Sequence, residues 1–316
     1  GDDVIIRDAT GAIMDEVSYD DNDPWPTCPD NNGPSLELID SNSDNALAAS
    51  WGPSSVIGGT PGAANNPGTC DAFDAEIASW LKYPPQTNEV ARSAILYAGL
   101  CVIADRFDLP LALHEIGCSG GLNLQCAQFG YSFGGAAFGQ TGSSLQLVPD
   151  WSGGLPPKVN VTVSARNGCD LNPLSVSEAD DAARLISYVW ADQPERIARV
   201  EAALAISRNS PPQLDRAGAA FWVEKRFEAD QGMGQVRVLC HTIAWNYFPK
   251  DVKTRILSHL EKVGAGASAE NPLAWLSFEF DGEDGGPFLR LRAWPGNAEF
   301  ETLAEADSHA NSIKWN

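Results

Sequence analysis

The stretch LALHEIGCSGGLNL, residues 111–124, decides the fold of the larger part of this chain. An apolar run ends in an acid, Glu115, and continues through a turn rich in glycine into the start of a helix. A strand, a turn and a helix in this order place backbone N–H groups beneath a ligand in α/β proteins. Gly117, Gly120 and Gly121 lack a Cβ, so a ligand can approach the backbone there. Glu115 is placed to accept hydrogen bonds from a ligand hydroxyl or amine.

The sequence on either side alternates between helical and strand patterns. A stripe of apolar residues at helical spacing predicts a helix over 88–106, before a strand over 111–116. Residues 236–245 are almost all apolar, which is typical of a strand buried on both faces of a parallel sheet. Residues 273–280 and 288–294 flank a polar turn and predict an antiparallel hairpin. This order predicts an α/β fold with a doubly wound, Rossmann-like sheet and a terminal antiparallel hairpin.

Other segments complete this predicted sheet. A capping box, Ser175-x-x-Glu178, predicts the start of a helix that runs through Trp190. Residues 130–158 are rich in glycine and predict an inserted hairpin. The remaining predictions are strands at 159–170 and 299–305 and helices beginning at Pro194 and spanning 216–228 and 251–264.

The first 69 residues differ from the rest in pattern and in charge. Residues 1–70 hold twelve acids against one base, Arg7, in a chain whose net charge is −21. They alternate as strands do, with turns rich in Pro and Asn, and show no helical period. We therefore expect a small all-β module, an immunoglobulin-like sandwich fragment, at 1–69 and an α/β domain at 70–316. Residues 62–76, small and polar, have the composition of a linker.

The acidic balance and the apolar pattern restrict the partners of this chain. Nucleic-acid binding without sequence preference needs clustered Lys and Arg, so none is expected. No stretch of about 18 apolar residues is present, so no membrane span is expected either. No leader peptide is visible, which favours the cytoplasm, while the β module leaves secretion or a surface location open. The oligomeric state and the substrate, a small molecule or a protein, cannot be predicted.

Cysteine and carboxylate spacings predict no metal site. The chain has seven cysteines and no CxxC, so neither a zinc ribbon nor a dense disulfide framework is indicated, although a Cys28–Cys70 bridge stays open. Residues 40–44 begin like a calcium loop, but Asn45 and Trp51 replace the glycine and glutamate that such a loop needs. Turn chemistry from the Asp and Asn side chains is the alternative.

The first module resembles a known domain family. Residues 1–67 resemble the C-terminal half of a lamin-tail domain, an immunoglobulin-like sandwich. The resemblance rests on four motifs, Trp25-Pro26, SLEL at 35–38, Trp51 and GTPG at 59–62. In bacteria, such domains resemble accessory binding modules on secreted or surface proteins, so the resemblance implies a binding role for this part.

The glycine-rich turn resembles the first motif of class I methyltransferases, in which an acid precedes three glycines at alternate positions. Glu115, Gly117 and Gly121 match this motif, and Ser119 stands where the middle glycine is usual. The resemblance implies that these four residues hold a nucleoside-type cofactor, S-adenosylmethionine.

A second motif supports the same cofactor. Residues 168–173, GCDLNP, resemble the second methyltransferase motif, whose acid accepts both ribose hydroxyls, and Asp170 is that acid here. The spacing from Gly117 is much longer than the roughly 20 residues usual in such folds. The predicted insertion at 130–158 must account for the excess. A turn or helix-capping role for Asp170 is the alternative.

The predicted buried strand ends at residues that are candidates for catalysis. His241 and Tyr247 lie at or just after its carboxyl end, where ligands bind in such sheets. They are predicted to position a methyl acceptor, with a role for His241 as a base left open. A structural role for a buried histidine is the alternative.

Two rival functions use the same residues. GCSGG at 117–121 matches the G-x-S-x-G nucleophile elbow of serine hydrolases, with His309 or His241 as the base. A hydrolase needs neither Glu115 nor Asp170, which favours the cofactor interpretation. A non-enzymatic, degenerate Rossmann scaffold is the third hypothesis.

Eight stretches spread over the α/β domain are typical of a single family: QTNEVARSA (86–94), LHEIGCSGGLNL (113–124), GCDLNPLS (168–175), SYVWADQPERIARV (187–200), HTIAWNYFP (241–249), NPLAWLSFE (271–279), AWPG (293–296) and EADSHANSIKW (305–315). Through them, residues 86–316 as a whole resemble one bacterial family, domain of unknown function 2332. That resemblance implies no activity.

Overall fold

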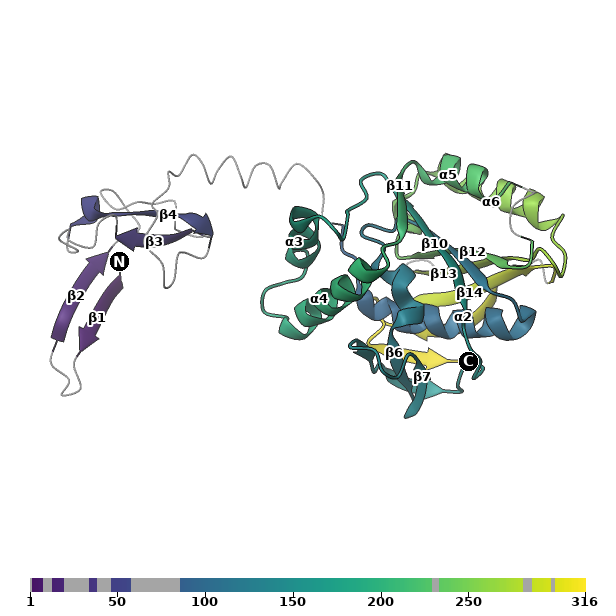
Figure 1. The fold of residues 1–316 in the computed structure, drawn as a ribbon, viewed down its shortest axis with the longest axis horizontal. Helices are drawn as coiled ribbons and strands as arrows, with labels where there is room; N and C mark the ends of the chain where they lie inside the picture. The colour runs from purple at the N-terminus through teal and green to yellow at the C-terminus, as the bar shows by residue number, and fades with distance from the viewer. Residues whose placement is uncertain are drawn as a thin grey trace. The chain divides into compact units, whose positions relative to one another are not determined.

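A computed structural model gives the fold of the 316-residue chain (Figure 1). It describes residues 2–7, 13–19, 34–38, 47–57, 86–228, 233–280, 286–296 and 299–316. The chain divides into two compact units, Gly1–Pro85 and Gln86–Asn316. The predicted boundary after residue 69 lies outside the described residues, as do the predicted Cys28–Cys70 bridge and the calcium-like residues 40–45.

The first unit contains two pairs of antiparallel strands. One pair is β1 (Asp2–Arg7) with β2 (Ile13–Tyr19), and the other is β3 (Pro34–Leu38) with β4 (Trp51–Ile57). A single 3₁₀ turn, η1 (Ala48–Ser50), precedes β4. In the described residues these pairs are separate two-stranded sheets.

The second unit is a mixed α/β structure built on a nine-stranded sheet with the order β11-β10-β5-β12-β13-β14-β15-β16-β9. The first five strands run parallel, β13 to β16 are antiparallel neighbours, and β9 pairs in parallel with β16. The predicted terminal hairpin is present as β13 and β14. The strands are β5 (Leu111–Ile116), β9 (Asp150–Gly153), β10 (Val163–Asp170), β11 (Gln213–Arg216), β12 (Val236–Thr242), β13 (Leu273–Phe280), β14 (Pro287–Trp294), β15 (Glu301–Ala306) and β16 (Ser312–Trp315).

Helices cover both faces of this sheet (Figure 1). Val238 and Cys240 of β12 pack in one apolar cluster with α2 (Ser93–Phe107), whereas Leu239 between them packs in a second cluster with α5 (Ala219–Arg226) and α6 (Lys250–Gly264). Successive side chains of a strand point to opposite faces, so a strand with both faces covered is apolar throughout. The remaining helices are α3 (Ala179–Ser187) and α4 (Pro194–Asn209), with 3₁₀ helices η2 (Val90–Arg92), η3 (Leu122–Gln128) and η4 (Trp245–Tyr247).

The segment between β5 and β10 explains the long spacing between the two predicted cofactor motifs. It forms a separate three-stranded sheet of β6 (Gly130–Phe133), β7 (Ala136–Gly139) and β8 (Gln146–Leu147), where a simple hairpin was predicted. Tyr131 of this sheet stacks on Tyr97 of α2 at 4.5 Å between ring centroids. The insertion therefore packs beside α2, and β10 still returns as the direct neighbour of β5.

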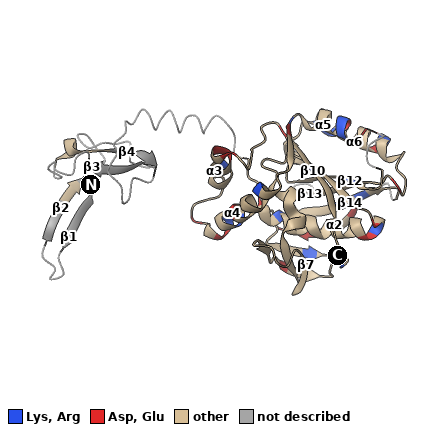
Figure 2. Cartoon of the chain, in the orientation of Figure 1, with Lys and Arg blue, Asp and Glu red and all other residues tan. Residues whose placement is uncertain are grey.

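Acidic side chains lie at the start of α3 and basic side chains at the end of α5, which is the arrangement that the helix dipole favours (Figure 2). Asp180 and Asp181 occupy the first turn of α3, and Lys225 and Arg226 occupy the last turn of α5. Among the helices of the described residues, none combines the length and apolar character that a membrane span requires.

Candidate binding site at the carboxyl ends of the parallel strands

The parallel strands bring the two predicted cofactor acids together. Glu115 of β5 pairs in register with Gly168 of β10, and Asp170 follows two residues later at the end of β10. Register partners on neighbouring strands, and residues two apart on one strand, point to the same face. Glu115 and Asp170 therefore lie on one face of the sheet, and the Asp170 charge contributes to the raised pKa of Glu115.

Glu115 is an almost fully buried acid with one unpaired oxygen. Its side chain is 2% exposed, and its Oε2 atom has no hydrogen-bond partner. Burial raises its pKa to about 8, and the Asp170 charge acts in the same direction, while the Arg92 charge opposes them. The carboxyl is therefore mostly neutral at pH 7 and can both donate and accept a hydrogen bond.

Asp170 has hydrogen-bond donors on both oxygens. Its Oδ2 accepts from the Ser119 backbone N–H at 3.0 Å. Its Oδ1 accepts from the Asn172 N–H at 2.9 Å and from the Gln86 side-chain amide at 2.7 Å. The Asn172 contact is the turn role that the sequence analysis gave as the alternative for Asp170. Asp170 has this contact and also lies on the same face of the sheet as Glu115.

The turn after β5 uses its backbone amides internally. The Gly117 and Cys118 N–H groups donate to the Cys169 carbonyl, and the Gly121 N–H donates to the Cys118 carbonyl. The expectation of bare N–H groups beneath a ligand is therefore wrong for these three amides. Long-range pairing with the end of β10, which local sequence does not reveal, satisfies two of them.

The turn requires left-handed backbone conformations. Gly117, Ser119 and Gly121 have φ of 67°, 51° and 66°, a region that L-residues other than glycine rarely adopt. A Cβ on Gly117 would lie 2.8 Å from Ala244, and one on Gly121 would lie 2.9 Å from Leu214. These glycines thus allow close packing of neighbouring segments.

His241, a predicted catalytic residue, lies on the opposite face from Glu115. Cys240 is the register partner of Glu115, so the next side chain, His241, points to the face covered by α5 and α6. The Trp275 indole N–H donates to His241 Nε2 at 2.9 Å, and Nδ1 is 2.7 Å from a Glu279 oxygen. Both ring nitrogens therefore have partners within the protein.

Two more polar residues belong to the segments after His241, Tyr247 on η4 and Glu279 on β13. Tyr247 lies on η4 with 82% of its surface exposed, and its phenol is an electrostatic neighbour of Arg92. Glu279 Oε1 also accepts from the Ala244 and Trp245 N–H groups, at 2.9 and 3.1 Å. Sequence reasoning missed Glu279, although an acid within the apolar run LAWLSFEF was a visible signal.

The serine-hydrolase alternative has no base in the described structure. The Ser119 hydroxyl donates to the Gln86 carbonyl at 2.8 Å, and the side chain is 4% exposed. His309 instead contacts the Ser308 hydroxyl at 3.3 Å. Within the described residues no histidine bonds Ser119, and no group of three or more His, Cys, Asp or Glu side chains could hold a metal ion.

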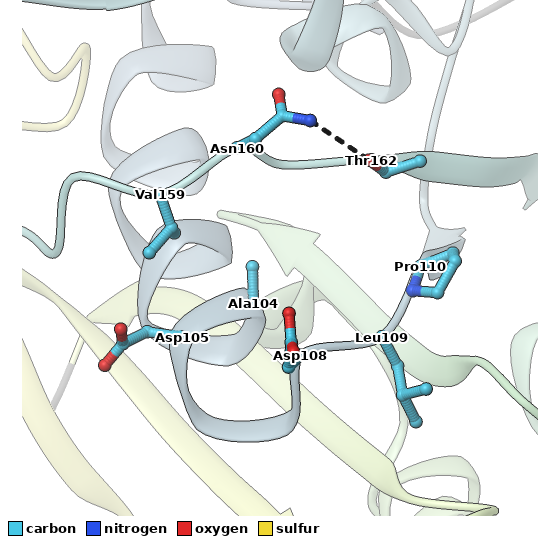
Figure 3. A pocket seen from close by; sticks show the side chains of 8 residues that line it. All are labelled: Ala104, Asp105, Asp108, Leu109, Pro110, Val159, Asn160 and Thr162. Atoms are coloured by element: carbon cyan, nitrogen blue, oxygen red, sulfur yellow. Dashed lines mark hydrogen bonds between the residues drawn. The ribbon is translucent and has the colours of Figure 1, made fainter.

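Two hollows of the described surface lie away from this site. One, of about 580 Å³, lies between the end of α2 and the start of β5, at the opposite edge of the sheet, and is lined by Asp105, Asp108, Pro110 and Asn160 among others (Figure 3). The second, of about 370 Å³, lies along β9, β15 and β16.

Fold and site together define a mixed α/β protein with acids gathered at the carboxyl ends of neighbouring parallel strands. Residues 37–315 match the model of a family described as uncharacterised proteins conserved in bacteria (DUF2332), and the chain belongs to this family. The predicted resemblance over 86–316 is confirmed, and the match begins earlier, so it includes β4 of the first unit. No curated protein and no solved structure matches the chain.

Proposed function

We propose that this chain binds S-adenosylmethionine through its adenosine moiety at the carboxyl ends of β5 and β10, as a methyltransferase-like protein. The observation that carries the proposal is the placement of Glu115 and Asp170 on one face of neighbouring parallel strands, on either side of the glycine-rich turn. Crevices at the carboxyl ends of such strands are the usual ligand sites of open α/β sheets.

The side chains at this edge fit the polar groups of a nucleoside. Asp170 offers carboxylate oxygens to a ribose diol. The Gln86 amide donates to Asp170 Oδ1, so a donor can reach this oxygen from the side where Gln86 lies. Glu115 Oε2, which lacks a partner, would gain one from a ligand hydroxyl or amine. Ser119 has the left-handed backbone that the motif's glycine would adopt. Bound S-adenosylmethionine would supply an activated methyl group.

The finer fold assignments belong to the same proposal. The parallel run β11-β10-β5-β12-β13, covered by helices on both faces, supports a doubly wound, Rossmann-like and methyltransferase-like core. The antiparallel pairs β1–β2 and β3–β4 support a lamin-tail-like origin for residues 1–67.

The methyl acceptor would meet the exposed η4 segment in this proposal. Tyr247 is an exposed polar group there and an electrostatic neighbour of Arg92. His241 acts as a positioning residue, because its Nδ1 contacts the same Glu279 oxygen that holds the Ala244 and Trp245 amides.

Isothermal titration calorimetry with S-adenosylmethionine tests the proposal. We expect sub-millimolar binding by the wild-type chain and a loss of at least about tenfold in affinity for Asp170→Ala, because hydrogen bonds to a charged group contribute about 1.5–3 kcal/mol. Asp105→Asn, an exposed acid at the other edge of the sheet, serves as the matched control and leaves affinity unchanged. Absence of binding by the wild-type chain contradicts the proposal.

A non-enzymatic scaffold is the second candidate, and the paired amides of the turn favour it. Gly117 and Cys118 donate to the Cys169 carbonyl, so these N–H groups serve the fold itself. A scaffold gives no heat with S-adenosylmethionine, and Asp170→Ala then changes only the free energy of unfolding.

A further inference from the structure

The residues before η2 form a strap over the carboxyl edge of the sheet. The strap, Gln86 to Glu89, is neither helix nor strand, and it leads into η2 and α2. Its two ends are held differently. Asn88 is 8% exposed and accepts from the Leu122 N–H at 2.9 Å, and Glu89 is 4% exposed and pairs with Arg196.

Gln86, at the other end of the strap, contacts the residues that the proposed ligand site requires. Its amide nitrogen donates to Asp170 Oδ1 at 2.7 Å, and its carbonyl accepts from the Ser119 hydroxyl at 2.8 Å. Its backbone also lies near the Tyr188 hydroxyl. Gln86 is only partly buried, and its neighbour Thr87 is exposed. Movement about Thr87 would therefore release Gln86 while Asn88 and Glu89 stay in place.

The contact between Gln86 and Asp170 leaves an acceptor unpaired. The Gln86 Oε1 atom is buried and has no hydrogen-bond partner. A buried polar atom without a partner costs free energy, so this arrangement is less stable than its hydrogen bonds alone would suggest.

Resting on the proposed function, we propose that Gln86 is a gate: its side chain occupies Asp170 in the closed chain and must leave before a ribose diol binds there. Gln86 and the ligand compete for the same carboxylate. The apparent affinity is then the intrinsic affinity multiplied by the fraction of chains in which the strap is open.

Two measurements on the full chain test the gate. Calorimetry with S-adenosylmethionine compares the wild type with Gln86→Ala. We expect Gln86→Ala to bind about tenfold more tightly, because its closed state has lost one charge-assisted hydrogen bond to Asp170. Asp105→Asn, an exposed acid outside the strap, is the control and binds like the wild type. Equal affinities for the wild type and Gln86→Ala overturn the gate and leave the proposed function standing.

The second measurement follows the Gln86 side-chain amide by NMR, with its resonances assigned from their loss in Gln86→Ala. Without ligand, we expect shifts away from those of a free amide, which return to free values in Asp170→Ala. Addition of S-adenosylmethionine to the wild type produces the same return. Binding without this return overturns the gate alone, whereas absence of binding by the wild type overturns the proposed function and the gate together.

Discussion

Glu115 shows how one buried side chain links the candidate site to stability. Its pKa rises from the ordinary glutamate value of 4.5 to about 8 in the folded chain, chiefly because burial disfavours the charged form. The folded chain therefore keeps a proton between about pH 4.5 and 8 that the unfolded chain releases. The contribution of Glu115 to the free energy of unfolding is largest below this window and falls as the pH rises through it.

Replacement of Glu115 by glutamine tests this assignment, because glutamine does not titrate. We expect Glu115→Gln to gain stability relative to the wild type as the pH rises from 5 to 8, by at most about 1.4 kcal/mol per pH unit. Urea unfolding at several pH values measures the difference. Glu201→Gln, at an exposed position on α4, gives a difference that is flat with pH. A flat difference for Glu115→Gln would show that its carboxyl is ionised in the folded chain.

At the scale of elements, α2 and the sheet approach closely because Gly99 lacks a side chain. A Cβ there would lie 2.7 Å from Leu276 Cδ1, in a fully buried contact with β13. Alanine favours a helix interior over glycine by about 1 kcal/mol, but overpacking of a core costs about 1–3 kcal/mol.

We expect Gly99→Ala to lower the free energy of unfolding by about 1 kcal/mol, since the overpacking exceeds the gain in helix propensity. Denaturant unfolding provides the measurement. Gly142→Ala is the control and leaves stability nearly unchanged, because a Cβ at Gly142 meets no atom within 4 Å. Increased stability of Gly99→Ala would mean that Leu276 repacks without strain.

Glu279 also links two elements, because one of its oxygens fixes the segment between β12 and η4. It accepts from the Ala244 and Trp245 N–H groups and contacts His241 Nδ1. The preceding residue, Ile243, has φ of 49°, which is strained for a β-branched side chain. The bonds to Glu279 stabilise this otherwise unfavourable backbone.

Replacement of Glu279 by alanine leaves buried donors without an acceptor, so we expect a loss of at least about 2 kcal/mol in the free energy of unfolding. Hydrogen exchange at Ala244 and Trp245 should accelerate in the same variant. Ser277→Ala, two residues earlier on the same face of β13, is the control and changes stability by at most about 0.5 kcal/mol. Unchanged exchange at both amides would contradict the role assigned to Glu279.

At the scale of the whole molecule, apolar pattern predicted the large elements of the second unit well. The helix expected at 251–264 is α6, and the apolar run 236–245 contains β12, because strong periodicity reflects burial directly. The capping box at Ser175 misplaced a helix start. The Ser175 N–H bonds Asp181, and α3 begins at Ala179 without a side-chain cap.

The candidate site was partly predictable for the same reason. Glu115 and Asp170 were found because each lies at or near the carboxyl end of a predicted strand, and parallel strands bring their carboxyl ends to one edge. Gln86 and Glu279 were missed, since their partners lie far away in the sequence. His241 was found by position, but its two hydrogen bonds depend on β13 packing beside β12.

The sequence by itself determined most of the large strands and helices of the second unit, the buried character of β12 and the acids Glu115 and Asp170 near the ends of two strands, but not β11 or β16. It could do so because burial and backbone conformation leave local, periodic marks on the chain. Only the tertiary structure decided that the amides of the turn are paired, that His241 lies on the opposite face from Glu115, and that Gln86 covers Asp170. These outcomes depend on register and long-range contact, for which a single sequence carries no local signal.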